Sequence, residues 1–135
     1  MTYELKRPPL APCPVEAVVA IVSGKWKARV LLELAATPAG FGALKRKLPG
    51  VTQQVLSAQL KALEKDGTVS RTPAGPDPLA GSRYALTDEG TSLLPVLDVV
   101  ASWGLGRLHR HGLDWDRPPS ARVYATEALN NRAQH

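Results

Sequence analysis

A stretch near the middle of the chain, GVTQQVLSAQLKALEKDG, carries hydrogen-bonding side chains at spacings that could let them read another molecule. If the stretch is a helix, Gln53, Gln54, Ser57 and Lys61 fall within an arc of about 100°, and its leucines lie on another side. A glutamine amide donates and accepts in one plane, which matches the major-groove edge of adenine, and a lysine reaches guanine or phosphate. The pattern therefore predicts a helix face that meets base pairs. The alternative is a polar face that only keeps a surface helix soluble.

The elements around this helix favour the first interpretation. FGALKRKLPG, residues 41–50, predicts a short helix with Lys45 and Arg46 facing outward, ended by a proline and a glycine. Thr52 is then a natural N-cap for the next helix, which should stop at Asp66-Gly67. Two short helices joined by so few residues form a helix-turn-helix pattern, in which the second helix presents its N-terminal residues to bases.

Two short strands should follow, at residues 68–74 and 83–87, separated by the turn-forming residues GPDPLAGS. A hairpin directly after a helix-turn-helix is a wing. Arg71 and Arg83 on this hairpin, like Lys45 and Arg46 before it, are expected to bind phosphates and to set the register on a duplex.

The outer parts of the chain read as helices with apolar faces. One should begin at Cys13-Pro14, a second should cover residues 26–37, and Thr87 should cap a long last helix that contains Pro95 as a kink. The last helix is apolar over most of its circumference, too much for a surface helix of so small a domain. A second copy of the chain is therefore expected to cover it.

The charge and the length set the broad class. The chain has 135 residues and a formal net charge of +5. Residues 44–72 hold six basic and two acidic side chains, a local net charge of +4 that suggests a polyanionic partner. We expect an extended arm over residues 1–12, one domain over 13–110 and a tail over 111–135 with a weakly helical segment. With no apolar run of membrane-spanning length and no signal-peptide pattern, we expect a cytosolic protein without a membrane contact.

The chain has one cysteine and three histidines, which bounds its chemistry. A single thiol excludes an intrachain disulfide, and no histidine has partners at metal-ligand spacing, so neither a metal nor another cofactor is expected. A thiol enzyme pairing Cys13 with His109 or His111 is disfavoured, because no orienting carboxylate or oxyanion motif is evident. Cys13 could instead be a reactive thiol activated by a helix N-terminus and opposed by Glu16, or an inert cap residue.

At this point the sequence resembles the HxlR-type family of winged helix-turn-helix regulators, which is related to the MarR type. The matching segments cover about residues 13–104 and include CPVE, GKW, PGVTQ, LKALEKDG and YALTDEG. The resemblance implies a mainly helical α+β fold with a two-stranded wing, and a homodimer held by the first and last helices. It also implies two recognition helices in successive major grooves, about 34–36 Å apart, and a cytosolic transcriptional regulator that is not an enzyme.

The resemblance extends to the site residues. It implies that Cys13 occupies the position of a sensing thiol in members that respond to oxidants, electrophiles or aldehydes. The wing loop departs from the usual proline-and-basic pattern, so the resemblance does not extend to a minor-groove contact of its tip. The residues expected to bind a pseudo-palindromic double-stranded operator are Lys45, Arg46, Thr52, Gln53, Gln54, Ser57, Lys61, Arg71 and Arg83.

Two alternatives remain open at the level of sequence. One is a regulator controlled by a non-covalent small molecule bound near Trp26 and Trp103, although aromatic residues at helical spacing favour the core of the protein. The other is a winged-helix protein-interaction module that does not bind DNA. The sequence does not distinguish a repressor from an activator.

Overall fold

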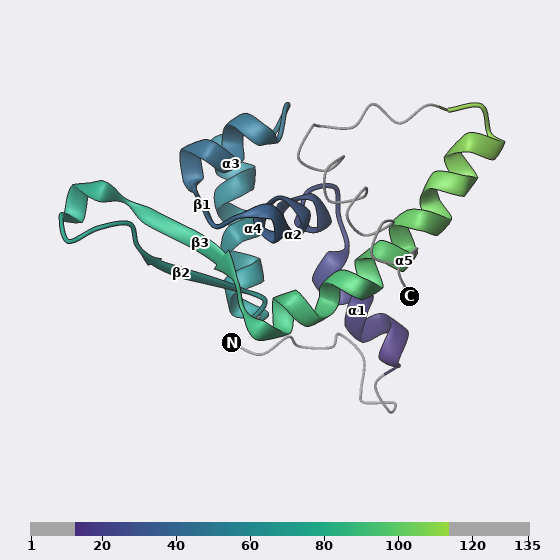
Figure 1. The fold of residues 1–135 in the computed structure, drawn as a ribbon, viewed down its shortest axis with the longest axis horizontal. Helices are drawn as coiled ribbons and strands as arrows, with labels where there is room; N and C mark the ends of the chain where they lie inside the picture. The colour runs from purple at the N-terminus through teal and green to yellow at the C-terminus, as the bar shows by residue number, and fades with distance from the viewer. Residues whose placement is uncertain (1–12, 114–135) are drawn as a thin grey trace.

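The computed structural model describes residues 13–113, which form five α-helices and a three-stranded antiparallel sheet (Figure 1). In chain order the elements are α1 (Pro14–Val22), α2 (Lys27–Ala36), β1 (Ala39–Gly40), α3 (Phe41–Lys47), α4 (Gln53–Lys65), β2 (Val69–Pro73), the 3-10 turn η1 (Pro78–Ala80), β3 (Ser82–Leu86) and α5 (Asp88–Arg110). This order confirms the predicted winged helix-turn-helix. The predicted arm at residues 1–12 and the predicted helical segment of the tail lie outside the described residues.

The signals that were predicted to delimit α4 act as expected. Thr52 is the N-cap, and its hydroxyl oxygen accepts a hydrogen bond from the backbone N–H of Val55 at 3.1 Å. The helix ends at Lys65, and Gly67 follows with φ +80, a left-handed conformation that glycine adopts without a steric penalty. Residues 53–65 therefore form one continuous helix with a fixed start and a fixed end.

The core is formed mainly by leucines and valines from α2, α3 and α4. The side chains that are at most 3% exposed include Val30, Leu31, Leu34, Leu44, Leu48, Leu56, Leu60 and Leu63. They lie on the inward faces of these helices, and for α4 this is the leucine side predicted from helical spacing. Trp26 differs slightly from the expectation, because it precedes α2 as its N-cap residue and is only half-buried against this core.

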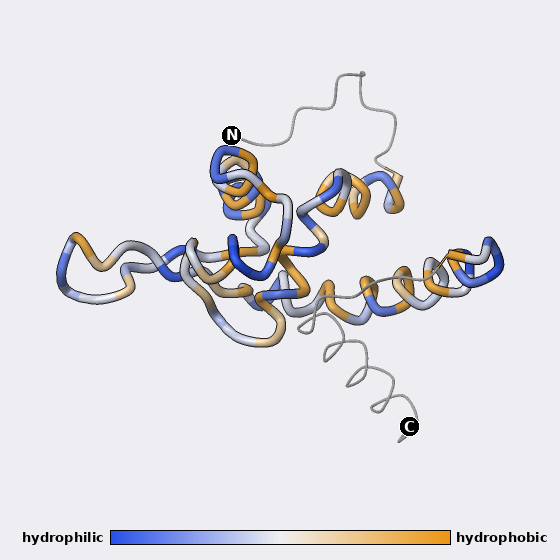
Figure 2. The backbone as a smooth tube through the Cα atoms, turned by 90° about the horizontal axis from the view of Figure 1, so that it is seen from above, coloured by the Kyte–Doolittle hydropathy of each residue, from blue (hydrophilic) through white to orange (hydrophobic). Residues whose placement is uncertain are grey.

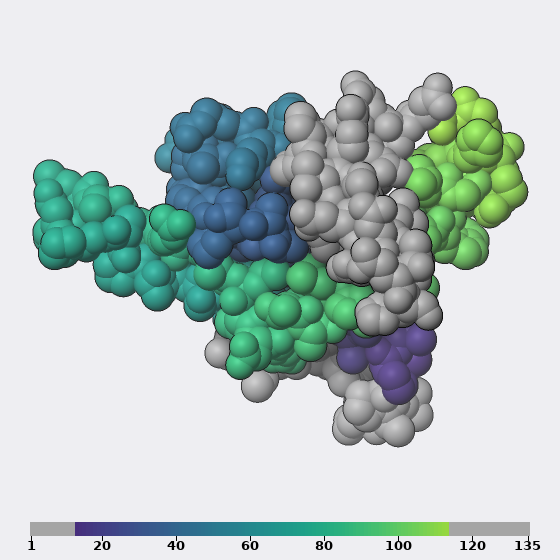
Figure 3. Space-filling view, viewed as in Figure 1, coloured from purple at the N-terminus to yellow at the C-terminus, as the bar shows by residue number. Residues whose placement is uncertain are grey.

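The sheet contains one strand more than the predicted hairpin. β1 pairs with β3 through Ala39 opposite Tyr84, and the strand order is β1-β3-β2. A two-residue strand has no alternation of apolar and polar residues, so no sequence pattern could indicate it. β1 pairs with Arg83 and Tyr84 of β3 and leads directly into α3, while the far end of the hairpin projects from the body as a wing (Figures 1 and 3).

Helix α5 continues past Pro95, which confirms the predicted place of this proline inside the helix, while the kink stays a prediction. Thr87 caps it by accepting a hydrogen bond from the N–H of Gly90 at 3.1 Å. Gly90 is buried directly against the backbone carbonyl of Thr68, where an added Cβ would overlap with the oxygen. The start of α5 is therefore pressed onto the turn that follows α4.

Both terminal helices present apolar side chains to solvent. On α1 they are Val15 and Val19, and on α5 they are Val96, Val99, Val100 and Trp103. Hydrophobic residues recur along the part of α5 that extends away from the body (Figure 2). Trp103 is 65% exposed, so the expectation that it belongs to the core is wrong for the single chain. Within residues 13–113, no helix has the length and the hydropathy that a membrane span requires.

The close approach at Gly90 gives a stability prediction. We expect Gly90→Ala to lower the free energy of unfolding by about 1–3 kcal/mol, because the new methyl group meets backbone that cannot rotate away. Gly42→Ala is the matched control, since its nearest neighbour is the flexible end of Arg46 at 3.4 Å. The control should be neutral or stabilising by up to about 1 kcal/mol. Equal urea-unfolding midpoints for Gly90→Ala and wild type would contradict this packing.

Candidate nucleic-acid interface

The face of α4 singled out in the sequence is turned away from the core. Gln53, Gln54 and Lys61 are exposed, and Ser57 is half-buried. The opposite side of the same helix is sealed, because Leu56, Leu60 and Leu63 are at most 1% exposed. The amide, hydroxyl and ammonium groups therefore lie on a surface that another molecule can reach.

The N-terminal end of α4 adds a favourable local field to this surface. Its first turn contains no acidic residue, so the partial positive charge of the helix end is not compensated there. Thr52, Gln53 and Gln54 at this end are all exposed. An anionic group such as a phosphate would be stabilised at this position.

The basic residues of α3 lie beside the turn that leads into α4. Lys45 and Arg46 are exposed, and Lys47 is half-buried. All three lie in the last turn of α3, where positive side chains complement the helix dipole. Because Leu44 and Leu48 anchor the other side of α3 in the core, these cations are held outward.

The two arginines of the wing do not form one cluster. The register places Arg71 opposite Tyr84, and Arg83 opposite Thr72. Since side chains alternate between the faces of a sheet, Arg71 and Arg83 point to opposite faces of the hairpin. The Arg71 Nε lies 3.6 Å from the Glu64 Oε1, and the Arg83 Nη2 donates to the backbone carbonyl of Pro38 at 3.5 Å. The carboxylate of Glu64 offsets part of the field of Arg71, whereas the contact of Arg83 is with an uncharged backbone carbonyl.

The tip of the wing carries an exposed leucine and one acidic residue. Leu79 in η1 is 92% exposed. The Asp77 Oδ1 accepts a hydrogen bond from the Leu79 N–H at 2.9 Å, which fixes this turn. No lysine or arginine occurs between Arg71 and Arg83, so the tip offers no cation to a minor groove.

Cys13 lies at the N-cap position of α1 and is exposed. Cys13 is thus the N-cap residue by position, its side chain makes no capping hydrogen bond, and both interpretations of its role stay predictions. His109 and His111 lie at the far end of α5 and are exposed. Within residues 13–113, no three histidine, cysteine or acidic side chains gather to hold a metal ion.

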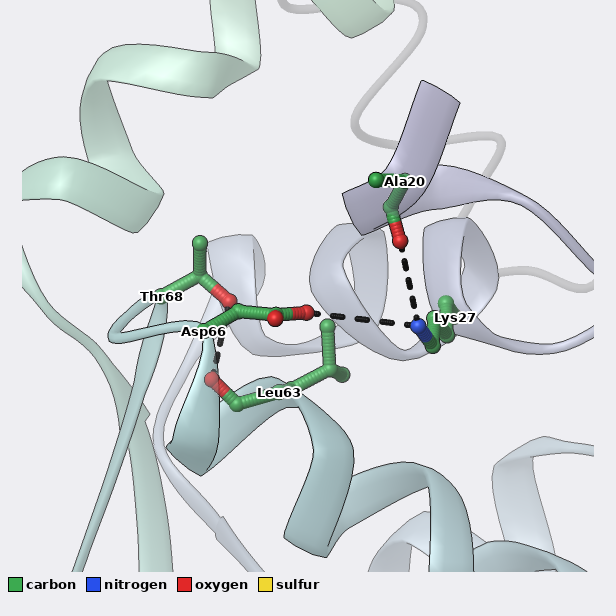
Figure 4. A network of polar contacts seen from close by, with 5 residues as sticks. All are labelled: Ala20, Lys27, Leu63, Asp66 and Thr68. Carbon is green, nitrogen blue, oxygen red and sulfur yellow. Dashed lines mark hydrogen bonds and ion pairs between the residues drawn. The ribbon is translucent and has the colours of Figure 1, made fainter. Parts of the chain in front are cut away.

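A polar network at the C-terminal end of α4 was missed by sequence reasoning. Thr68 is fully buried, and its hydroxyl donates to the carbonyl of Leu63 at 3.2 Å (Figure 4). The Nζ of Lys27 lies 3.9 Å from the Oδ2 of Asp66 in the same turn. From the sequence, Lys27 and Asp66 would be assigned to the surface like most charged residues. Only the fold brings them together.

Comparison with known proteins identifies a family and several relatives. Residues 21–111 match the family described as HxlR-like helix-turn-helix. The chain is 40% identical over 95 residues to the uncharacterized HTH-type transcriptional regulator YdzF of Bacillus subtilis, covering 70% of this chain and 86% of that protein.

Solved structures agree with the sequence relatives. A structure of the HTH-type regulator YtcD superposes with a TM-score of 0.65 at 33% identity, covering 73% of this chain and 99% of that one. The redox regulator HypR in its reduced form gives a TM-score of 0.64 at 32% identity, covering 70% of this chain and 92% of that one.

Proposed function

The chain belongs to the HxlR-like helix-turn-helix family of transcriptional regulators rather than to an enzyme class, and from this premise we propose that it binds specific double-stranded DNA sequences as a homodimer. The observation that carries the proposal is the orientation of α4. Its leucine side is buried, and its amide-bearing side, with Gln53 and Gln54, is exposed beside the basic end of α3.

The residues divide into two roles. Gln53 and Gln54, at the N-terminal end of α4, read base edges in the major groove, where one good bidentate contact contributes about 1–3 kcal/mol of discrimination. Ser57 and Lys61 continue this surface along the helix and contact bases or phosphates. Thr52 fixes the start of the helix through its hydrogen bond to Val55 and offers an exposed N-terminus to a phosphate.

The cations outside α4 bind the phosphate backbone and set the register. Lys45 and Arg46 do so from α3, and Arg83 does so from the wing. Arg71 contributes less, since it faces the other side of the hairpin and is paired with Glu64. Contacts of this kind add affinity without sequence information, and they weaken steeply as salt rises, because the release of condensed counterions becomes less favourable.

The two roles are separable by mutation. Against a duplex selected from a random library and a scrambled duplex, Gln54→Ala should reduce the ratio of affinities about tenfold, because it removes a base contact. Arg83→Ala should weaken both duplexes alike and reduce the slope of log K against log salt by about one unit. Fluorescence anisotropy at two salt concentrations measures both effects.

Gln59→Ala is the matched control, because Gln59 lies on the same helix, half-buried on the core side. It should leave the affinity ratio unchanged. If wild type shows no preference among duplexes, or if the Gln54 and Gln59 variants lose preference equally, the assigned reading face is wrong.

The homodimer is proposed from the exposed apolar surface of the terminal helices. Val99 and Val100 on α5 are 61% and 59% exposed, and Trp103 follows on the same helix at 65%. Val15 and Val19 on α1 are also exposed. Burial of such side chains against a second copy is favourable by about 25 cal/mol for each Å² removed from water. A two-fold dimer would present two α4 helices to a pseudo-palindromic operator.

A charge placed on this surface should dissociate the dimer. Val100→Glu should give a monomer in analytical ultracentrifugation, because the carboxylate would be buried without a partner at the interface. Leu79→Glu is the control, because it replaces an apolar side chain by a carboxylate at the wing tip, where Leu79 is 92% exposed. It should leave the protein a dimer in the same measurement. A monomeric wild type, or a dimeric Val100→Glu, would overturn the proposed interface.

Cys13 is the proposed sensing residue for oxidants or electrophiles. Its thiol is exposed at the start of α1, one of the two helices assigned to the dimer. Because the chain has one cysteine, three reactions are available: a disulfide to Cys13 of the second copy, a mixed disulfide with a small thiol, or alkylation. In alkylation by a quinone the thiolate sulfur bonds to a ring carbon, and the reduced ring takes up the proton.

Benzoquinone should release wild-type protein from its selected duplex and leave Cys13→Ser bound. Mass spectrometry should find a single adduct, at Cys13, in the wild type. The variant should carry none, because the serine hydroxyl is a far weaker nucleophile than a thiolate. Equal loss of binding by both proteins would assign the effect to another side chain and end the sensor role of Cys13.

A further inference from the structure

A lysine in the first turn of α2 bridges two other helices of the domain. The side chain of Lys27 places its ammonium group between the C-terminal end of α1 and the C-terminal end of α4 (Figure 4). Its Nζ donates to the backbone carbonyl of Ala20 at 3.4 Å and lies 3.9 Å from the Oδ2 of Asp66. One charged group thus contacts both α1 and the cap residue of α4.

This pair is not a solvent-separated surface pair. The side chains of Lys27 and Asp66 are only 16% and 25% exposed. The Oδ2 of Asp66 is buried and accepts no hydrogen bond from any residue in the described range, so the nearby ammonium balances its charge. Removal of either partner would leave the other charge desolvated, which costs far more than the loss of an exposed pair.

The turn that contains Asp66 is also bound to α5. The hydroxyl of Thr87, the N-cap of α5, donates to the carbonyl of Gly67 at 2.6 Å. The N–H of Thr87 donates to the carbonyl of Thr68 at 3.0 Å. The end of α4 is therefore held from one side by α5 and from the other side, through Lys27, by α1.

We propose that Lys27 is a positioning residue that couples the placement of α1 to the placement of α4. Both of its contacts are longer than the usual 2.7–2.9 Å of a charged hydrogen bond. A shift of α1 that withdraws the Ala20 carbonyl frees the ammonium to approach Asp66, and a shift in the opposite sense draws it away. The cap of α4 therefore responds to the position of α1, and by reciprocity α1 responds to α4. The consequence for DNA rests on the proposed role of α4 as the reading helix.

The coupling itself can be measured without DNA. In hydrogen-exchange mass spectrometry of the full chain, Lys27→Met and Asp66→Asn should each speed exchange in both residues 14–23 and residues 63–68. Lys27→Arg, which keeps the charge, should restore much of the protection. Lys25→Met is the matched control, because it removes the same charge from an exposed lysine nearby, whose Nζ lies 5.0 Å from the centroid of the Trp26 ring. It should leave exchange in both segments unchanged.

The effect on recognition is a second, independent readout. Lys27→Met should lower the ratio of affinities for the selected and scrambled duplexes about three- to thirtyfold, as expected for residues that couple two sites. The melting temperature and the dimer mass are measured alongside, so that a general loss of structure is recognised. In the double variant Lys27→Met/Asp66→Asn, the affinity ratio should fall no further than in the more severe single variant, because both substitutions remove the same link.

Each outcome separates the two proposals. If Lys27→Met speeds exchange only within α2, or if the two single variants add fully in the double variant, the link between α1 and α4 is overturned. If exchange changes as expected while wild type prefers no duplex, the coupling stands and the DNA-reading role fails. If exchange changes as expected and the affinity ratio of Lys27→Met stays at the wild-type value, the coupling of α1 to α4 stands and its effect on recognition is overturned.

Discussion

The burial of one side of α4 is the constraint on which the rest of the structure depends. Leu56, Leu60 and Leu63 are removed from water in one core cluster that also contains side chains of α2 and α3. A helix that fixes three leucines in a core has no freedom to rotate, because a turn about its axis would expose them. The glutamines at its start and Lys61 near its middle are outward for this reason alone. The cap at Thr52 and the stop at Gly67 then set how far the exposed face extends.

The turn after α4 connects this fixed helix to the terminal helices α1 and α5. Thr68 is buried there, Gly90 packs against its carbonyl, and Thr87 bonds to it from the start of α5. Lys27 reaches the same turn from the other side. The helices with exposed valines and Trp103 are thus attached to the end of the helix that faces outward. An interface formed by those helices and a surface formed by α4 would not be mechanically independent.

The wing illustrates how register decides the use of charge. Arg71 and Arg83 are both exposed arginines of one hairpin, yet the pairing turns them to opposite faces. One of them meets Glu64 from α4, and the other bonds to the chain before β1. The tip, with Leu79 and Asp77, carries no lysine or arginine, whereas Lys45 and Arg46 of α3 and Lys61 of α4 are exposed. Electrostatic attraction to a duplex would therefore act mainly through the helices.

The sequence by itself determined the local elements: the helical spacing of Leu56, Leu60 and Leu63, the caps Thr52 and Thr87, and the turn formers of the wing all involve residues close together in the chain. Those signals gave the winged helix-turn-helix and the outward face of α4. Only the tertiary structure decided the third strand β1, the opposed wing arginines, the exposure of Trp103 and the contact of Lys27 with Asp66. These depend on which segments distant in sequence pack together, and neither periodicity nor composition encodes a pairing between two distant side chains.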